Sequence, residues 1–277
     1  MKILVIDRES ISTQLMSNRL EPLGHKITEE PVKNNAVERL SSETYDMIFI
    51  DPSPLTSARP IILKLRRAAA NYPYIVQMGG ESTQIEAIQA GANDVISKPI
   101  DHEILDTAVD NARFLTTLIE RIGDDSEDFP SAGGIIAKSA FNQLFLSAID
   151  RADRYGERTF IVFINITNYK AIYEAEGPYA ADYTVAKLSK YLVRIRRQSD
   201  IIAQTSPSEF ALLLQRPMYE TEPLEAANRF AEALTSCQDL FEKEGHAPEV
   251  SVQLTDLPVG SRIVSHTITK DHLKPES

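Results

Sequence analysis

The first 120 residues alternate between short apolar runs and segments with helical periodicity, and this alternation limits the fold more than any other feature. The apolar runs are KILVI, MIFI, YIVQM and DVIS, and the segments between them, such as 10–20 and 60–70, have apolar residues three or four positions apart. Strands that alternate with helices in this way pair in parallel, with helices on both faces of the sheet. The pattern therefore predicts an α/β domain with a doubly wound parallel sheet.

Three charged residues follow these apolar runs directly. Asp7, Asp51 and Lys98 each come just after a predicted strand. Because the carboxyl ends of parallel strands meet at the same edge of a sheet, we expect the three side chains to converge there.

The composition describes a globular chain with an acidic surface. The 277 residues suffice for two domains, and the formal charge of −11 argues against a broad nucleic-acid-binding surface. A small anion held by a local arginine cluster is compatible with that charge, because salt screens distant charges. The single cysteine, Cys237, suits a reducing cytoplasm. No apolar run reaches membrane-spanning length, so no membrane partner is expected. No metal-ligand spacing connects the five histidines, His25, His102, His246, His266 and His272.

The domain limits follow from periodicity and composition. A helical stretch over about 101–122 has an apolar stripe of Ile104, Ala108, Leu115, Leu118 and Ile122. Asn111 could set the register of a paired helix, or the stretch could be the last helix of the domain, packed on its sheet. The acidic segment 123–134, GDDSEDFPSAGG, is a linker. We therefore predict domains at 1–122 and 135–277, the second an α+β domain with a hairpin centred on SPSEF.

The first domain resembles the receiver domain of two-component response regulators. The resemblance rests on KILVIDRES, IFIDP and GANDVISKPID and extends over 1–120. It implies a flavodoxin-like fold, with Asp51 as phosphoryl acceptor, Asp7 as a Mg²⁺ ligand and Lys98 as the partner of the phosphate.

Two positions depart from the receiver pattern. Arg8 stands where a second acid is usual, and Met78 stands where a hydroxyl side chain is usual. A guanidinium at that place would repel Mg²⁺ and could pair with Asp51 as a substitute cation. Glu9 offers a carboxylate one residue later. We expect a receiver fold kept for docking or dimerisation, without a Mg²⁺ site, and with phosphorylation of Asp51 as the alternative.

The second domain resembles the GGDEF family, the diguanylate cyclases that make cyclic di-GMP from two GTP molecules. SPSEF falls on the signature, FINITNYK on the strand before it and GIIAKSAF on the opening helix, over about 130–255. The positions that the resemblance assigns to the cyclase site are held by Asn165, Thr167, Lys170, Tyr173, Asp182, Ser206, Pro207, Ser208 and Glu209.

Several of these residues lack the chemistry that a two-metal reaction requires. Asn165 and Ser208 are neutral where the resemblance implies metal-binding acids. Pro207 replaces a glycine, fixes φ near −65° and has no N–H to donate. The closing helix of the family has no counterpart before Ser277. From these differences we expect a degenerate domain and a chain that is not an enzyme.

A second site of the family is retained in residue type. Arg197 and Asp200 form an Arg-x-x-Asp motif five residues before the signature, and Arg151 falls on the third position of that site. The resemblance assigns this trio to binding of the product, cyclic di-GMP. An arginine fork can hold guanine O6 and N7 or a phosphate, and a carboxylate can accept from guanine N1–H and N2–H₂.

The sequence therefore predicts a cytoplasmic signalling protein that acts as a cyclic di-GMP receptor, without a cofactor. We expect a homodimer and a protein partner that the sequence does not identify. Three alternatives stay open: a ligand-independent adaptor, an enzyme with an unusual metal arrangement, and phosphate-gated dimerisation through Asp51.

Overall fold

A computed structural model describes residues 1–80, 82–124, 126–241 and 245–273. The chain divides into two compact units. Unit 1 comprises Met1–Arg121, Ile149–Glu157 and Pro258–Gly260, and unit 2 comprises Ile122–Ala148, Arg158–Leu257 and Ser261–Ser277. The domain limits given above remain a prediction. They were derived from sequence patterns, whereas the two units are defined by packing.

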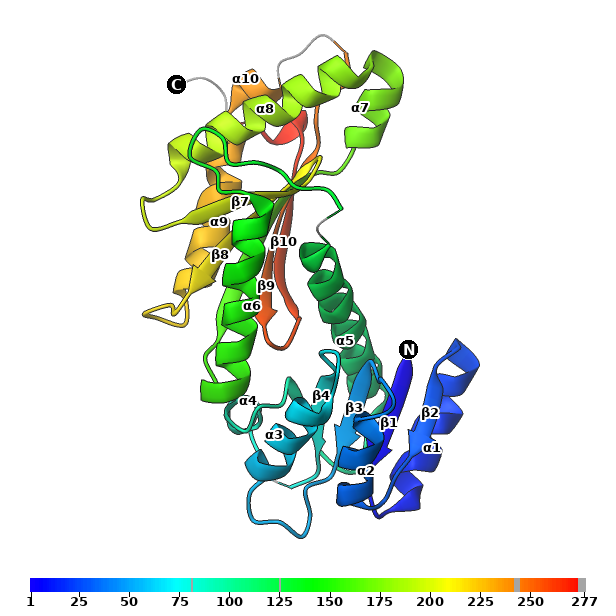
Figure 1. The fold of residues 1–277 in the computed structure, drawn as a ribbon. Coiled ribbons are helices and arrows are strands. Elements are labelled where there is room, and N and C mark those ends of the chain that lie inside the picture. The colour runs from blue at the N-terminus through cyan, green and yellow to red at the C-terminus, as the bar shows by residue number, and fades with distance from the viewer. Residues whose placement is uncertain (81, 125, 242–244, 274–277) are drawn as a thin grey trace. The chain divides into compact units, whose positions relative to one another are not determined.

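Unit 1 is built on a five-stranded parallel sheet in the order β2-β1-β3-β4-β5, which confirms the predicted doubly wound fold (Figure 1). Its strands are β1 (Lys2–Ile6), β2 (Lys26–Glu29), β3 (Met47–Ile50), β4 (Tyr74–Met78) and β5 (Asp94–Ile96). Its helices are α1 (Ser10–Leu20), η1 (Glu21–Leu23), α2 (Lys33–Leu40), α3 (Arg59–Ala68), α4 (Gln84–Gln89) and α5, which runs over His102–Gly123 into unit 2.

Both faces of this sheet are buried, as the continuous apolar runs predict. Leu4 and Ile48 belong to one core cluster with residues of α2, α3 and α4. The alternate residues Ile3 and Phe49 point to the other face and are also fully buried.

Helix α5 buries an apolar stripe that differs by one residue from the predicted one. Ile104 is 48% exposed, and the neighbouring Leu105 is buried in its place, followed by Ala108, Ala112 and Leu115. The prediction for Ile104 is wrong because the buried face follows a spacing of three and four residues from Leu105. Burial of this stripe within one chain favours the last-helix interpretation over a seam that waits for a second chain.

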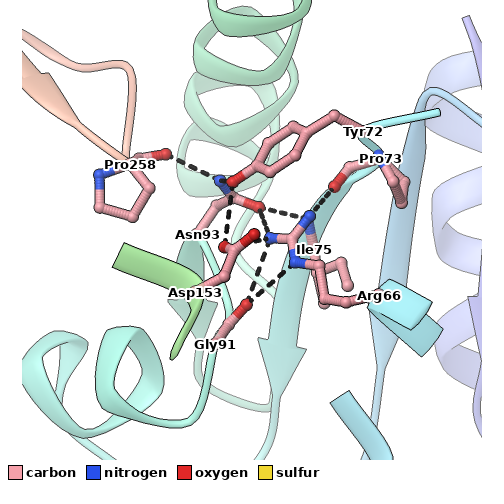
Figure 2. Close-up of polar contacts among 8 residues, drawn as sticks. All are labelled: Arg66, Tyr72, Pro73, Ile75, Gly91, Asn93, Asp153 and Pro258. Carbon is pink, nitrogen blue, oxygen red and sulfur yellow. Dashed lines mark hydrogen bonds and ion pairs between the residues drawn. The ribbon is translucent and has the colours of Figure 1, made fainter. Parts of the chain in front are cut away.

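Two segments from later in the sequence complete unit 1, and a buried polar network fixes them there (Figure 2). Asn93, which is 0% exposed, is its centre. Its Oδ1 accepts from Ile75 N–H (2.7 Å) and from Arg66 Nη2 (2.6 Å). Its Nδ2 donates to Tyr72 Oη (3.0 Å) and to the Pro258 carbonyl (2.8 Å). One side chain thus joins the first residues of β4 to a turn more than 160 residues away.

The last turn of α6 (Lys138–Tyr155) enters the same network. Asp153 accepts a hydrogen bond from Tyr72 Oη (3.2 Å) and pairs with Arg66 (3.4 Å). Two glycines with positive φ allow the backbones to approach. A Cβ at Gly156 would lie 2.8 Å from Gln89 Cα, and one at Gly260 would lie 2.9 Å from the Asn111 carbonyl. Residues 149–157 and 258–260 are therefore integral to unit 1.

Unit 2 is built on an antiparallel sheet in the order β10-β9-β6-β8-β7 (Figure 1). Its strands are β6 (Thr159–Ile166), β7 (Ile201–Ser206), β8 (Glu209–Gln215), β9 (Val250–Leu257) and β10 (Arg262–Ile268). Its other elements are the first part of α6, α7 (Tyr169–Glu176), α8 (Pro178–Ile195), α9 (Glu222–Thr235), α10 (Gln238–Phe241) and η2 (Lys270–His272).

The apolar side chains of β6, β8 and β9 form one core with residues of α8 and α9. The predicted single helical region before the hairpin is two helices, because Gly177 has a φ of 88° and Pro178 cannot continue α7. Strand β10 was not predicted. Its more buried side chains are Val264, His266 and Ile268, whereas Ile263 is exposed, so its sequence gives little apolar alternation.

The hairpin tip has only Pro207 and Ser208 between its strands. Among described residues other than glycine, positive φ is recorded at Arg216 and at neither tip residue. The strands instead shift register between Gln204 and Ser206, and this irregularity lets the chain turn without glycine.

In the ranges that the structure describes, no helix has both the length and the apolar character needed to cross a bilayer.

Candidate functional site

The carboxyl edge of the sheet in unit 1 brings together Asp7, Asp51 and Lys98. Lys98 Nζ lies 2.5 Å from Asp51 Oδ2 and 2.8 Å from Asp7 Oδ2. Asp7, Asp51 and Lys98 follow β1, β3 and β5 respectively, whose carboxyl ends converge because the strands are parallel. Gly79 lies beside them with a φ of 73°, and a Cβ there would be in ordinary contact with Asp51 Oδ2 at 3.5 Å.

Burial and ion pairing act in opposite directions on these groups. Burial by itself raises the pKa of Asp51, but hydrogen bonds from Lys98 and from Ser53 N–H outweigh it, so the pKa lies below its ordinary value. Burial likewise lowers the pKa of Lys98, and the carboxylates of Asp51 and Asp7 raise it well above its ordinary range. Asp7 is only 2% exposed, so this charge depends on the lysine for compensation.

Arg8 does not act as the predicted substitute cation. Its side chain is exposed, and the ion pair recorded for Asp51 within the described residues is with Lys98. Glu9 does reach the site, because its Oε2 lies 3.2 Å from Lys98 Nζ. Met78 is fully buried in β4 and offers no hydroxyl.

Lys33 is a residue of this edge that the sequence analysis missed. Its Nζ donates to the Ser53 carbonyl at 2.6 Å. The pKa of Lys33 is lowered, by burial first and by the charge of Arg8 second, and the charges of Asp51 and Asp7 oppose this shift. The ammonium group is therefore within electrostatic range of these groups. Lys33 begins α2, away from every sequence motif, and only the fold shows where its side chain goes.

The receiver resemblance implies Mg²⁺ at this edge, but the residues present do not fit it. Mg²⁺ binds oxygen ligands in a near-octahedral arrangement. Here Asp7, Asp51 and Glu9 each direct an oxygen to Lys98, and the Ser53 carbonyl accepts from Lys33. Over the described ranges, no group of three or more His, Cys, Asp or Glu side chains is arranged to hold a metal ion.

In unit 2, the hairpin tip meets the end of β6. Ser208 Oγ donates to Asn165 Oδ1 at 2.9 Å, and Asn165 lies opposite Glu209 in the strand register. The Glu209 carboxylate accepts from Thr205 Oγ1 at 2.7 Å. Asn165, Ser208 and Glu209 therefore lie together, as the resemblance to the signature implies.

A hollow of about 500 Å³ lies beside the tip and includes Asp182, Tyr169 and Pro207 in its lining. Tyr169 Oη donates to Asp182 Oδ1 at 3.2 Å. Tyr173, one of the cyclase positions that the resemblance assigns, is 47% exposed, and its ring centroid lies 6.4 Å from that of Tyr169. The volume is within the range of small-molecule sites.

Arg229, which lies outside the Arg-x-x-Asp motif of unit 2, holds the aspartate of that motif. The Asp200 carboxylate is 8% exposed and pairs with Arg229 of α9 at 2.8 Å. Its Oδ2 also accepts from the backbone N–H of Arg197 at 2.8 Å. Arg196 Nη1 donates to the Asp200 carbonyl at 2.9 Å. The side chain of Arg197 is exposed. Three arginines thus surround one aspartate.

Arg151, the third predicted member of the ligand site, belongs to unit 1, whereas Arg197 and Asp200 belong to unit 2. Arg151 Nε donates to Glu157 Oε2 at 2.7 Å, and its guanidinium lies over the Tyr155 ring at 5.6 Å. Its place in a shared site with Arg197 and Asp200 stays a prediction.

Two family models match the chain. The response regulator receiver domain matches residues 3–110, and the diguanylate cyclase GGDEF domain matches residues 131–257. The chain is a receiver domain fused to a GGDEF domain. The sheet of unit 1 and the hairpin-bearing sheet of unit 2 agree with this assignment, and the chain is accordingly a signalling protein.

The receiver domain is also similar to the two-component response regulator PhoP of Pseudomonas aeruginosa, with 29% identity over 109 residues. The match covers 38% of this chain and 48% of that relative, so the chain spans about half the length of the curated relative it matches. Among solved structures, a two-component response regulator from Clostridium difficile matches 41% of this chain and 95% of its own, with 26% identity and a TM-score of 0.37. The GGDEF domain of PA1120 (TpbB or YfiN) from Pseudomonas aeruginosa matches 43% and 70%, with 20% identity and a TM-score of 0.37.

The GGDEF match corrects the expectation that the chain is not an enzyme. Residues 131–257 fit the diguanylate cyclase family model despite the neutral residues at several signature positions. That expectation was wrong because it judged activity from single positions such as Asn165 and Ser208, whereas the match to the diguanylate cyclase family extends over the whole domain.

Proposed function

We propose that this receiver–GGDEF protein binds cyclic di-GMP in its GGDEF domain through Arg197 and Asp200. The exposed guanidinium of Arg197, adjacent to a carboxylate already fixed in position, is the observation that carries the proposal. A site that is ordered before binding loses less conformational entropy when the ligand arrives.

The charges around Asp200 support an anionic ligand. Arg229 pairs with the Asp200 carboxylate, Arg196 donates to the Asp200 backbone carbonyl, and Arg197 is adjacent with an exposed side chain, in a chain whose formal charge is −11. A local excess of positive charge in an acidic protein attracts a dianion over short distances, where salt screening is weakest.

The residue types also support guanine over adenine. An arginine fork donates to O6 and N7 of guanine, whereas adenine presents an amino group where guanine has O6. Arg197 has an exposed side chain for this contact. Asp200 supplies the acceptor for N1–H and N2–H₂, and Arg229 balances the carboxylate, so the ligand's charge falls to Arg197.

Calorimetric titration of the full chain with cyclic di-GMP tests the proposal. We expect saturable binding that Arg197→Ala weakens at least about tenfold, because a charge-assisted pair contributes roughly 1.5–3 kcal/mol. Arg194→Ala is the matched control, because it removes another exposed arginine of the same region. Cyclic di-AMP should bind more weakly than cyclic di-GMP in the same titration.

Turnover of GTP with Mg²⁺ or Mn²⁺ is measured on the same samples, because the matched family comprises diguanylate cyclases. Equal affinity of wild type and Arg197→Ala would exclude the proposed site. Absence of binding heat together with absence of a GTP product would favour an interaction scaffold instead.

A second function is favoured by the contacts of Lys98 in the receiver domain. We propose that Asp51 accepts a phosphoryl group from an acyl phosphate. A bond forms between an Asp51 carboxylate oxygen and phosphorus, the bond from phosphorus to the acyl oxygen breaks, and the carboxylate of the donor leaves. Lys98, 2.5 Å from Asp51, supports the proposal because an ammonium group offsets phosphoryl charge. Incubation with acetyl phosphate should add the mass of one phosphate, and Asp51→Asn should lose it.

A further inference from the structure

The carboxyl edge of the receiver sheet carries two lysines beside its carboxylates. Three carboxylates, Asp7, Glu9 and Asp51, contact the ammonium group of Lys98. Lys33 is a second cation of this edge, since its Nζ donates to the Ser53 carbonyl and its charge interacts with Asp51 and Asp7. The two ammonium groups offset most of the negative charge that a divalent ion would otherwise neutralise.

Lys98 Nζ lies within 3.2 Å of one oxygen of each of the three carboxylates. The Ser53 carbonyl, whose residue also donates its N–H to Asp51 Oδ1 at 2.8 Å, accepts from Lys33 Nζ at 2.6 Å. A divalent ion would have to displace a lysine from each of these ligands and would face the repulsion of the ammonium groups.

We infer that Lys33 is a resident cation that takes the place of the divalent metal beside Asp51, so that this receiver site works without a metal. Lys33 is positioned for this by α2, whose first residue it is, and by the Ser53 carbonyl. Lys33 and Lys98 together supply the positive charge that an added phosphoryl group requires.

Binding of Mn²⁺, an ion that prefers the same oxygen ligands as Mg²⁺, tests the inference directly. Free Mn²⁺ is counted by electron paramagnetic resonance while the full chain is titrated at millimolar ion concentrations. Wild type should show no saturable binding. Lys33→Met, which keeps most of the side-chain volume and removes the charge, should bind Mn²⁺ at least roughly tenfold more tightly. Adding Asp51→Asn to Lys33→Met should remove the gain.

Lys64→Met is the control, because it makes the same substitution at an exposed lysine of another helix, α3. It should behave as wild type. Saturable Mn²⁺ binding by wild type that Asp51→Asn abolishes would overturn the inference without use of the Lys33 variant. A folded Lys33→Met protein, judged by circular dichroism, that gains no binding would overturn it as well.

The role of Lys33 in phosphorylation rests on the proposed function of Asp51 as phosphoryl acceptor, whereas the Mn²⁺ titration does not depend on it. Incorporation of phosphate from acetyl phosphate should proceed in EDTA as it does in Mg²⁺. Incorporation that requires Mg²⁺ would refute the resident cation and leave the role of Asp51 intact. Absence of incorporation in both conditions would refute the role of Asp51, and the Mn²⁺ titration would still decide the role of Lys33.

Discussion

Replacing Asn93 by alanine should destabilise unit 1 more than any exposed asparagine substitution. The amide of Asn93 makes four hydrogen bonds of 2.6–3.0 Å in a place that is 0% exposed (Figure 2). Arg66 and Tyr72 keep other partners after the substitution, because Arg66 also donates to carbonyl groups and Tyr72 also donates to Asp153. The losses therefore fall on Ile75 N–H and the Pro258 carbonyl.

The size of the effect follows from these two backbone groups. A buried polar group left without a partner costs about 1–3 kcal/mol. Two such groups, with the small cavity that alanine leaves, give an expected loss of about 3–5 kcal/mol in the free energy of unfolding. The control is Asn71→Ala, because Asn71 is exposed and donates a single hydrogen bond to the Tyr45 carbonyl at 2.8 Å. That substitution should cost less than about 1.5 kcal/mol.

Two measurements check this prediction. Urea unfolding followed by circular dichroism gives the loss in free energy for each variant. Hydrogen exchange reports on the Ile75 amide itself, whose exchange should accelerate by roughly two to three orders of magnitude in Asn93→Ala if exchange occurs through unfolding of unit 1. If Asn93→Ala and Asn71→Ala lost the same free energy, or if the Ile75 amide kept its protection, the reasoning on this network would be wrong.

Two further predictions concern pH. The pKa of the Asp153 carboxyl is raised, by burial first, with Arg66 and Tyr72 opposing, so the folded state holds this proton at a pH where the unfolded chain releases it. The stability of wild type relative to Asp153→Asn should therefore fall as pH rises from about 4 through the raised pKa. Urea unfolding at each pH measures this difference in free energy, and a difference that does not change with pH would contradict the prediction. Burial lowers the pKa of His25, and the N-terminus and Arg113 act in the same direction. The stability of wild type relative to His25→Gln should thus rise as pH increases toward and through about 6.5, and a fall over that range in the same urea series would refute the assignment.

Most of the fold could be predicted because it depends on periodicity. The runs KILVI and MIFI are buried on both faces, and this makes them read as strands of a parallel sheet without any tertiary information. Helix α1 also lies at the predicted residues, although its buried face includes Ser12 and Thr13 beside Met16 and Leu20. Strand β10 and the exposure of Ile104 could not be predicted, because each depends on which neighbour covers a surface. The attachment of residues 258–260 to unit 1 involves Asn93, and that of residues 149–157 involves Asp153, polar residues that no periodicity marks.

In each candidate site, some residues belong to a sequence motif and could be predicted, whereas others are brought there only by the fold. Asp7, Asp51 and Lys98 could be placed together because each ends a parallel strand. Lys33 and Arg229 could not, because each reaches its site from a helix that carries no motif, α2 and α9. In both sites this added residue is a cation near a carboxylate that is largely buried. Burial of a carboxylate is costly without a compensating charge, so a buried acid in a motif indicates that a cation must come from elsewhere in the fold, although the sequence does not say which one.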